Sequence, residues 1–229
     1  MQVLKKINEK LVKYNFSSRK GTPIKYIVIH DTGNTSKGAD ANAHFTLHNR
    51  ENRGASAHYF VDDKQILRII KDEDKSWHCG DGKGRYGITN ENSIGVEMCI
   101  NADGDVNKTY DNTLFLVNYL MRKYSIPINK VVRHYDASRK TCPNTWSNNN
   151  WDDWNKFIKD LSNTQKEKVN YKVLINKLYI NIFGRDADSE GLNYWNDKLN
   201  DGLTLGDFLK SMGESEEFKQ IYIDTMLVS

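Results

Sequence analysis

Short runs of β-branched and other apolar residues alternate with segments of helical periodicity over the first 160 residues of this 229-residue chain. Residues 26–30 form such a run and indicate a buried strand that ends in a loop, and residues 93–100 form another. Residues 109–124 instead place apolar side chains at helical spacing and stop before Pro127. Because strands and helices alternate, the sequence predicts an α/β fold in which helices flank a central mixed sheet.

Shorter local signals indicate the remaining elements of this region. Asp40 is a good N-cap for a helix, and the turn residues 62–64 separate two apolar runs that would pair as a hairpin. A final short strand precedes a polar loop, and a closing helix follows that loop. The predicted elements are a helix over 40–51, hairpin strands over 57–61 and 65–70, a strand over 130–133 and a helix over 151–161.

The strand signals disappear after residue 161, and the larger domain is therefore assigned to residues 1–161. Residues 162–170 are polar and without periodicity, which indicates a linker between two domains. Beyond it, apolar residues at helical spacing mark three helices, which predicts a small all-α domain over residues 171–229. About 59 residues are near the lower limit for an independent fold, so this domain should be only modestly stable.

Charge is distributed unevenly along the chain. The net charge is +3, but residues 171–229 carry six basic and ten acidic residues, a net −4, which leaves +7 for residues 1–170. A basic first part suits an anionic partner such as a bacterial wall or a nucleic acid. The sequence has neither a recognition helix with clustered Arg and Lys nor zinc-finger spacing, so no nucleic-acid partner is expected. No run approaches the roughly 20 apolar residues that span a bilayer, so membrane insertion is not expected either.

The N-terminal residues and the cysteines bear on where the chain works. The segment that begins Met1-Gln-Val-Leu-Lys-Lys lacks the apolar core and cleavage site of a signal peptide. The chain is therefore expected to be made in the cytoplasm and to leave it by another route. Cys79, Cys99 and Cys142 are odd in number and form no disulfide framework, so at least one thiol is available for other chemistry.

Two histidines and one cysteine lie at or shortly after the ends of predicted strands. His30 ends the first predicted strand, His134 follows the last one, and Cys142 comes eight residues later. A catalytic zinc site needs three protein ligands and one open position for water, and His and Cys are preferred donors. The spacing favours a zinc site, but it also fits ordinary partly buried histidines and a cysteine that acts as a small apolar residue.

Five short motifs in this region follow one another in order, and together they are far more specific than any one of them. They are Ile27-Val-Ile-His30-Asp-Thr-Gly33, Gly54-Ala-Ser-Ala-His58-Tyr-Phe-Val-Asp62, Trp77-His-Cys-Gly-Asp81, Ser93-Ile-Gly-Val-Glu97 and Arg133-His134-Tyr-Asp136 with Lys140-Thr-Cys142-Pro143. This arrangement resembles the N-acetylmuramoyl-L-alanine amidases of the type shared by phage lysins, bacillus autolysins and peptidoglycan-recognition proteins. The resemblance covers roughly residues 20–160.

The resemblance implies a zinc ion, Zn2+, held by His30, His134 and Cys142. Such a metal lowers the pKa of bound water towards about 7 and polarises a carbonyl. The implied reaction is hydrolysis of peptidoglycan at the amide bond between N-acetylmuramic acid and L-alanine of the stem peptide. Without a signal peptide, the implied context is a phage or prophage endolysin that acts on the cell wall after release from the host cytoplasm.

Two further residues match catalytic positions of the family. Lys140, two residues before Cys142, would stabilise the oxyanion that forms when an amide is attacked. Glu97 matches the carboxylate that some members use as a general base, although a solvent-facing strand carboxylate is the alternative interpretation. The family's catalytic tyrosine would fall at Ala57, so proton transfer is assigned to Glu97. Tyr59, two positions on, would share the face of Ala57 only in a regular strand.

The remaining histidines have weaker assignments. His58 and His78 are assigned to substrate binding, as is Trp77, which would stack on sugar or peptide unless it anchors its loop. His44 and His48 lie four residues apart on a predicted helix, a spacing that can bind metal. Because no third ligand lies near them in the sequence, a solvated helix face is the preferred interpretation.

The C-terminal helices resemble a small helical module of unassigned function found in bacterial extracellular proteins. The matching residues are 178–195 and 215–218. Asp186, Asp188 and Glu190 suggest a calcium loop, but the run lacks the length and closing glutamate of an EF-hand. An acidic helix N-terminus explains these residues more simply. By analogy with lytic enzymes that pair a cutting domain with an anchor, this module is expected to bind the wall.

Two other functions remain open at this point. A peptidoglycan-recognition module on the same fold would bind without cutting, and the presence of Cys142 argues against it. A structural zinc site would need a fourth protein ligand, which His44 or His78 would have to supply. Bacterial peptidoglycan is the expected partner of either an amidase or a recognition module, and the oligomeric state does not follow from the sequence.

Overall fold

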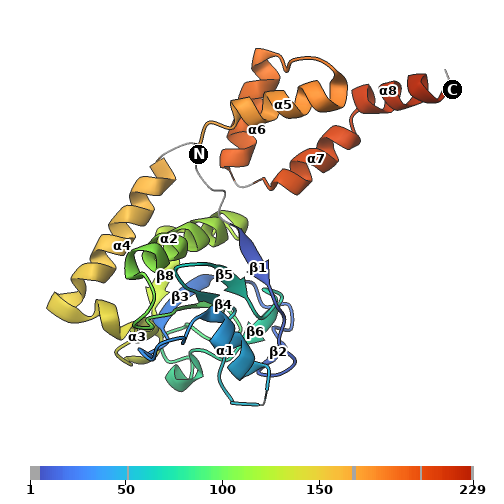
Figure 1. Cartoon of the computed structure of the whole chain (residues 1–229). Coiled ribbons are helices and arrows are strands. Elements are labelled where there is room, and N and C mark those ends of the chain that lie inside the picture. The colour runs from blue at the N-terminus through green and yellow to red at the C-terminus, as the bar shows by residue number, and fades with distance from the viewer. Residues whose placement is uncertain (1–5, 51, 167–168, 202, 228–229) are drawn as a thin grey trace. The chain divides into compact units, whose positions relative to one another are not determined.

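Two compact units make up the chain (Figure 1). One comprises Met1–Thr164 and the other Gln165–Ser229. Among the described residues, no helix is both long enough and apolar enough to cross a membrane. The computed structural model describes residues 6–50, 52–166, 169–201 and 203–227. The first five residues, part of the segment examined for a signal peptide, and Glu51, the predicted end of a helix, thus lie outside the described residues.

A six-stranded sheet forms the centre of the first unit, in the strand order β1-β5-β4-β7-β3-β8. The two longest strands, β3 and β7, are parallel neighbours, whereas β4 and β5 pair antiparallel around residues 62–64. The predicted mixed sheet and its hairpin are therefore confirmed. The sheet strands are β1 (Ile7–Glu9), β3 (Tyr26–Asp31), β4 (Tyr59–Val61), β5 (Ile66–Arg68), β7 (Ser93–Met98) and β8 (Val131–Arg133), and β2 (Phe16–Ser18) and β6 (Asp74–Ser76) form a separate antiparallel pair.

Helices cover both faces of this sheet, and Figure 1 shows α1 and α2 on opposite sides of it. Ile29 of β3 and Val96 of β7 belong to a buried cluster that includes Leu116 of α2 and Phe157 of α4. We call this side the back face, and the side on which Phe60 packs with α1 the front face. The helices are α1 (Ala41–His48), α2 (Val106–Lys123), α3 (His134–Ser138) and α4 (Asn148–Lys166), with 3-10 turns η1 (Gly80–Gly82), η2 (Ile128–Lys130) and η3 (Asn144–Trp146).

Strand register decides which side chains of β3 and β7 share a face. His30 of β3 lies opposite Glu97 of β7, and the next pair is Asp31 with Met98. Met98 belongs to the core of the back face. Because side chains alternate along a strand, His30 and Glu97 both point to the front face, at the carboxyl ends of neighbouring strands.

Three strands and one short helix are absent from the sequence prediction. Strands β1, β2 and β6 have three residues each, too few for an alternating pattern to be recognised. Helix α3 occupies the start of the segment predicted as a polar loop. The Asp136 carboxylate accepts hydrogen bonds from the backbone and the side chain of Arg133, and this capping interaction stabilises the first turn of α3.

Helix α4 extends further than predicted. It continues to Lys166, so residues 162–166 of the predicted linker are helical. The Asn118 amide of α2 donates a hydrogen bond to the Thr164 hydroxyl, which ties this added turn to α2. Polar residues can extend a helix when they have such partners. A linker predicted from polarity alone is therefore too long. Residues 167–168 of the predicted linker lie outside the described residues.

The second unit contains four helices among its described residues, one more than predicted. Its core includes Ile175, Phe208 and Met212, and the Trp195 indole donates a hydrogen bond to the Tyr179 hydroxyl at 3.0 Å. The confirmed small helical domain consists of α5 (Lys172–Phe183), α6 (Ser189–Asn200), α7 (Leu205–Gly213) and α8 (Glu216–Leu227).

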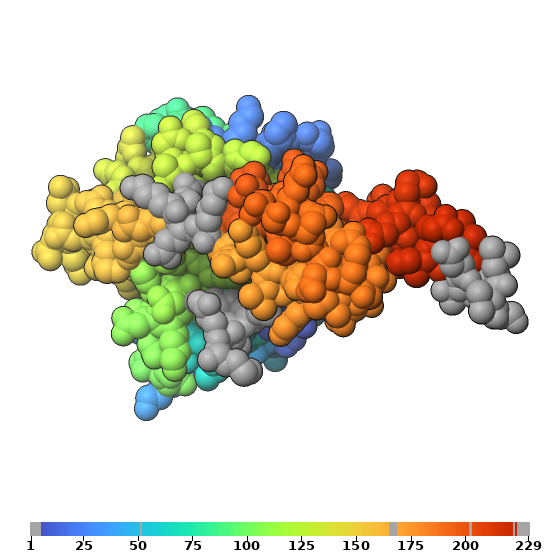
Figure 2. All heavy atoms as spheres, turned by 90° about the horizontal axis from the view of Figure 1, so that it is seen from above, coloured from blue at the N-terminus to red at the C-terminus, as the bar shows by residue number. Residues whose placement is uncertain are grey.

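The additional helix α8 begins at the acidic residues that the sequence resemblance placed at the end of the module. Glu217 accepts two hydrogen bonds from the Arg185 guanidinium, which links α8 to the turn after α5. The surface of these helices, orange to red in Figure 2, includes exposed apolar and aromatic side chains: Val173, Ile180, Tyr194, Leu205, Leu209 and Ile223.

Candidate active site

His30, His134 and Cys142 come together on the front face of the first unit. His30 lies near the end of β3, His134 begins α3 directly after β8, and Cys142 precedes η3. One ligand atom of each residue lies within 4.8 Å of the other two. The Cys142 Sγ is 3.7 Å from the His30 Nδ1. Ligands about 2.0–2.3 Å from a tetrahedral zinc are about 3.3–3.8 Å apart, so this pair already has the spacing of a zinc site.

Two polar atoms, one in the cluster and one next to it, are buried without a hydrogen-bond partner. They are the Nδ1 of His134 and the Oε2 of Glu97. The Glu97 Oε1 is 4.0 Å from the His30 Nδ1, so the carboxylate faces the cluster. Buried polar atoms normally have partners, and unpaired ones call for an explanation such as a bound ion. Two imidazoles, one thiol and a nearby carboxylate are the donor set that suits a catalytic zinc ion.

Burial sets the protonation of the three candidate ligands. It lowers the pKa of His30 well below the ordinary value, and the rings of His78 and His134 lower it further. Burial also lowers the pKa of His134, although Asp81 opposes the shift. Both imidazoles are therefore neutral at neutral pH, as metal binding requires. Burial raises the pKa of the Cys142 thiol to about 12, so a thiolate at this position needs a cation beside it.

Glu97 has the same need for a neighbouring positive charge. Burial raises the pKa of its carboxyl to about 8, the Asp31 carboxylate adds to this shift, and Lys140 opposes it. A divalent cation at the cluster would favour the ionised form and so make Glu97 a proton acceptor. Lys140 is exposed, and its charge acts on Glu97 and on both histidines of the cluster. These residues together could activate water and stabilise a developing oxyanion.

Comparison with known proteins identifies the fold and its family. Residues 20–145, more than half of the chain, match the family model of N-acetylmuramoyl-L-alanine amidases. The chain belongs to this amidase family. We therefore call the first unit the amidase unit. The family match confirms the resemblance seen in the five sequence motifs.

Curated relatives are found among Bacillus amidases. The N-acetylmuramoyl-L-alanine amidase CwlH of Bacillus subtilis (strain 168) is 40% identical over 139 residues, which cover 61% of this chain and 53% of CwlH. The amidase XlyA of the same strain is 40% identical over 129 residues, which cover 55% of this chain and 42% of XlyA. The chain thus spans about half the length of these relatives.

Solved structures support the fold of the amidase unit. A mutant endolysin from Bacillus subtilis matches with a TM-score of 0.62 and 35% identity, covering 69% of this chain and 99% of that one. The catalytic domain of XlyA matches with a TM-score of 0.61 and 34% identity, covering 68% of this chain and 99% of that one. Residues 156–222, which comprise the end of α4 and most of the second unit, match a domain of unknown function, DUF4214, which confirms the resemblance to a module of unassigned function.

Tyr59 of the amidase unit lies away from the cluster. Its side chain is 1% exposed and belongs to the core of the back face, and its hydroxyl donates a hydrogen bond to Asp72 at 2.7 Å. Phe60, not Tyr59, lies opposite Glu97 in the strand register. Ala57, at the position of the family's tyrosine, is fully buried. The Tyr59 hydroxyl is therefore directed away from the front-face cluster.

The burial of His58 and His78 does not fit the substrate contacts predicted for them. His58 is 0% exposed, and its Nδ1 accepts a hydrogen bond from the Gly95 backbone N–H at 3.0 Å. His78 is 9% exposed, and both of its ring nitrogens have partners inside the unit. Trp77 is partly buried and donates from its indole to the Ser17 hydroxyl at 3.1 Å. This contact matches the loop-anchoring interpretation of Trp77.

The solvated helix face predicted for His44 and His48 is wrong. Both side chains are 8% exposed, because this side of α1 packs on the front face of the sheet. The His44 ring stacks on Phe60 with 4.9 Å between the ring centroids. Burial lowers the pKa of both histidines, to about 4 for His48, so both are neutral at neutral pH. They form part of the packing between α1 and β4.

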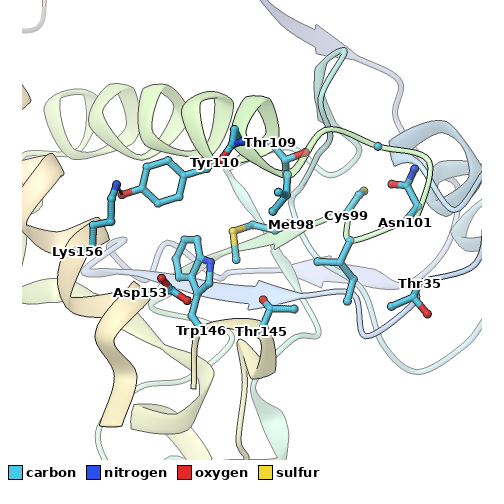
Figure 3. A pocket seen from close by; sticks show the side chains of 14 residues that line it. Thr35, Met98, Cys99, Asn101, Thr109, Tyr110, Thr145, Trp146, Asp153 and Lys156 are labelled. Atoms are coloured by element: carbon cyan, nitrogen blue, oxygen red, sulfur yellow. Dashed lines mark hydrogen bonds between the residues drawn. The ribbon is translucent and has the colours of Figure 1, made fainter. Parts of the chain in front are cut away.

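A cavity of about 400 Å³ lies at the carboxyl end of β7, where Met98 and Cys99 line it (Figure 3). Met98 and Trp146 in its lining belong to the core of the back face, whereas Glu97 points to the front face. None of the three candidate metal ligands lines this cavity. Asp31, the residue after His30, connects the cavity and the cluster, because its carboxylate accepts hydrogen bonds from the backbone and hydroxyl of Thr145 in the cavity lining.

Proposed function

We propose that the chain is a zinc-dependent hydrolase that cleaves the amide bond between N-acetylmuramic acid and L-alanine in bacterial peptidoglycan, in the manner of a phage or prophage endolysin. The observation that carries this proposal is the front-face cluster. His30, His134 and Cys142 lie together there. The Nδ1 of His134 and the Oε2 of the neighbouring Glu97 are buried without a hydrogen-bond partner. Membership of the amidase family indicates which bond such a cluster would cleave.

In this proposal His30, His134 and Cys142 hold the metal. Zinc at that position would supply a Lewis acid and make water acidic enough to attack an amide near neutral pH. Glu97 would take the proton from the attacking water and deliver it to the departing amine of L-alanine. Lys140, whose positive charge reaches the cluster, would stabilise the oxyanion that forms on the amide carbonyl. A non-catalytic recognition module would need neither the proton transfer by Glu97 nor the oxyanion stabilisation by Lys140.

Removal of the metal tests the proposal. A strong chelator is expected to abolish the clearing of a suspension of purified bacterial walls, and added Zn2+ is expected to restore it. The physical reason is that neither Cys142 nor Glu97 readily ionises without a neighbouring cation. Elemental analysis before and after chelation supplies the control. Full clearing by protein shown to be metal-free would rule out a metal-dependent site.

We further propose that the second unit attaches the enzyme to the wall. A chain of residues 1–166, which keeps all of α4, should hydrolyse soluble muramyl peptides as the full chain does but sediment less with whole walls. The loss arises because attachment raises the local concentration of the amidase unit at an insoluble substrate.

The attachment should rest on specific contacts, because the second unit carries excess negative charge and wall polymers are anionic. Exposed aromatic side chains such as Tyr194, which is 53% exposed, are suitable contacts. Binding by isolated residues 169–229 should therefore persist in about 1 M salt, where the Debye length is about 3 Å. If these residues never sediment with walls, while their deletion breaks up oligomers of the chain, they serve assembly and not attachment.

A further inference from the structure

Two residues of one loop contact the two histidines of the cluster. The loop follows β6 and contains the motif Trp77-His-Cys-Gly-Asp81. The His78 Nδ1 is 3.1 Å from the His30 Nε2, and the Asp81 Oδ1 is 2.8 Å from the His134 Nε2. Each histidine of the cluster is thus held by its Nε2, which leaves its Nδ1 available to a metal.

The hydrogen bonds around His78 determine which nitrogen of His30 carries a proton. The Ser93 hydroxyl donates its one proton to the Thr89 carbonyl at 2.5 Å, so it must accept from the His78 Nε2, which is 3.0 Å away. A neutral His78 then has a lone pair on Nδ1, and this atom accepts from the Nε2–H of His30. The Nδ1 of His30 is left with its lone pair, 3.7 Å from the Cys142 Sγ.

Asp81 determines the proton position of His134 more directly. A carboxylate can only accept hydrogen bonds, so the His134 Nε2 opposite it must carry the proton. The Nδ1 of His134 therefore has a lone pair, and it is the buried atom without a partner. The two histidines reach the same protonation pattern through two different partners, three residues apart on one loop.

The loop that carries these partners is held against the cluster. The Asn90 side-chain oxygen accepts hydrogen bonds from the backbone N–H groups of His78 and Cys79, at 3.0 and 2.9 Å. A Cβ on Gly82 would lie 2.1 Å from the Ala137 carbonyl of α3, the helix that His134 begins. A Cβ on Gly95 would lie 2.7 Å from the His78 ring. Close approach at these two glycines lets the loop reach both histidines.

We propose that His78 and Asp81 are positioning residues that fix the tautomers of His30 and His134, so that both histidines present Nδ1 to the zinc ion. This assignment rests on the proposed metal-dependent function and adds two residues to it, in place of the substrate contact first predicted for His78. Hydrogen-bonded partners of metal-binding histidines orient the ring and raise its basicity, and their loss costs about 10–100-fold in metal affinity. His78 and Asp81 of this motif would therefore support metal binding without being metal ligands.

Zinc affinity of the full chain, measured by competition with a chelator, tests this proposal. His78→Phe and Asp81→Leu remove the partner and should each weaken zinc binding by about 10–100-fold. His78→Asn and Asp81→Asn keep a side-chain oxygen near the acceptor position and should restore part of the affinity. His44→Gln, at a buried histidine outside the cluster, and Glu91→Gln, at a carboxylate paired with Lys75, are controls expected to stay within about twofold of the parent.

Tautomer populations separate a positioning role from a merely structural one. Long-range proton–nitrogen correlation spectra of the metal-free full chain should show His30 and His134 protonated on Nε2. His78→Phe should shift the tautomer balance of His30 alone, and Asp81→Leu that of His134 alone, whereas the two Asn variants should stay closer to the parental balance. A lower melting temperature with parental tautomers and parental zinc affinity would overturn the proposal. A parent chain that binds zinc with these tautomers and yet hydrolyses no wall would overturn the proposed function and leave the positioning role intact.

Discussion

Replacement of Cys142 by serine is expected to remove zinc binding and wall hydrolysis together. Serine offers a neutral hydroxyl, which is a much poorer zinc ligand than a thiolate. Loss of a partner that only supports a ligand costs about 10–100-fold in metal affinity, so the loss of a ligand should cost more than about 100-fold. The measurements are zinc content by elemental analysis and clearing of purified walls in the presence of one equivalent of Zn2+.

Cys99→Ser supplies a matched control for this change. Cys99 is 3% exposed and Cys142 is 5% exposed, so both substitutions place a hydroxyl in a buried site, but Cys99 is not part of the cluster. The Cys99→Ser chain is expected to bind one zinc ion and to clear walls, with some loss of thermal stability. A Cys142→Ser chain that retains stoichiometric zinc and parental activity would contradict the proposed ligand set.

Replacement of Glu97 by glutamine is expected to lower turnover by about 100-fold or more while zinc remains bound. Glutamine keeps the volume of the side chain but cannot accept a proton, and lost general acid–base catalysis has this magnitude. The measurements are kcat on soluble muramyl peptides, zinc content and melting temperature. Lys140→Ala should also keep its metal and show its loss mainly in kcat, because oxyanion stabilisation acts in the transition state.

Tyr59→Phe distinguishes Glu97 from the other proton carrier considered in the sequence. It removes a hydroxyl that donates to the buried Asp72 on the back face, so it should cost about 1–3 kcal/mol of stability without a comparable loss of kcat. A fully active Glu97→Gln chain together with an inactive, folded Tyr59→Phe chain would show that the base is assigned to the wrong residue.

The sequence pattern indicated two of the three residues of the cluster, and the family resemblance implied the full set. His30 and His134 each follow an apolar run, and such runs become neighbouring parallel strands whose ends lie on one edge of a sheet. The roles of His78 and Asp81 could not be predicted in this way. Their hydrogen bonds join residues 48 and 53 positions apart, and no periodicity connects such distant positions.

Two errors in the sequence prediction have a common physical origin, because polarity was taken as a sign of exposure. His44 and His48 are polar but lie on the side of α1 that packs against Phe60. The residues after Arg133 are polar but begin a helix, because Asp136 caps it. In both cases contacts within the fold decide the outcome, ring contacts with Phe60 for the two histidines and a helix cap for Asp136, and a sequence pattern does not record such contacts.

End-group analysis of digested peptidoglycan identifies which bond the chain cleaves. Purified peptidoglycan is incubated with the zinc-loaded chain, and new amino groups and new reducing sugar ends are both quantified, with the Cys142→Ser chain as the inactive reference. We expect new N-terminal L-alanine in step with clearing, and no new reducing ends. New reducing ends without free L-alanine amino groups would contradict this expectation and make the chain a glycosidase, and binding without either product would make it a recognition module.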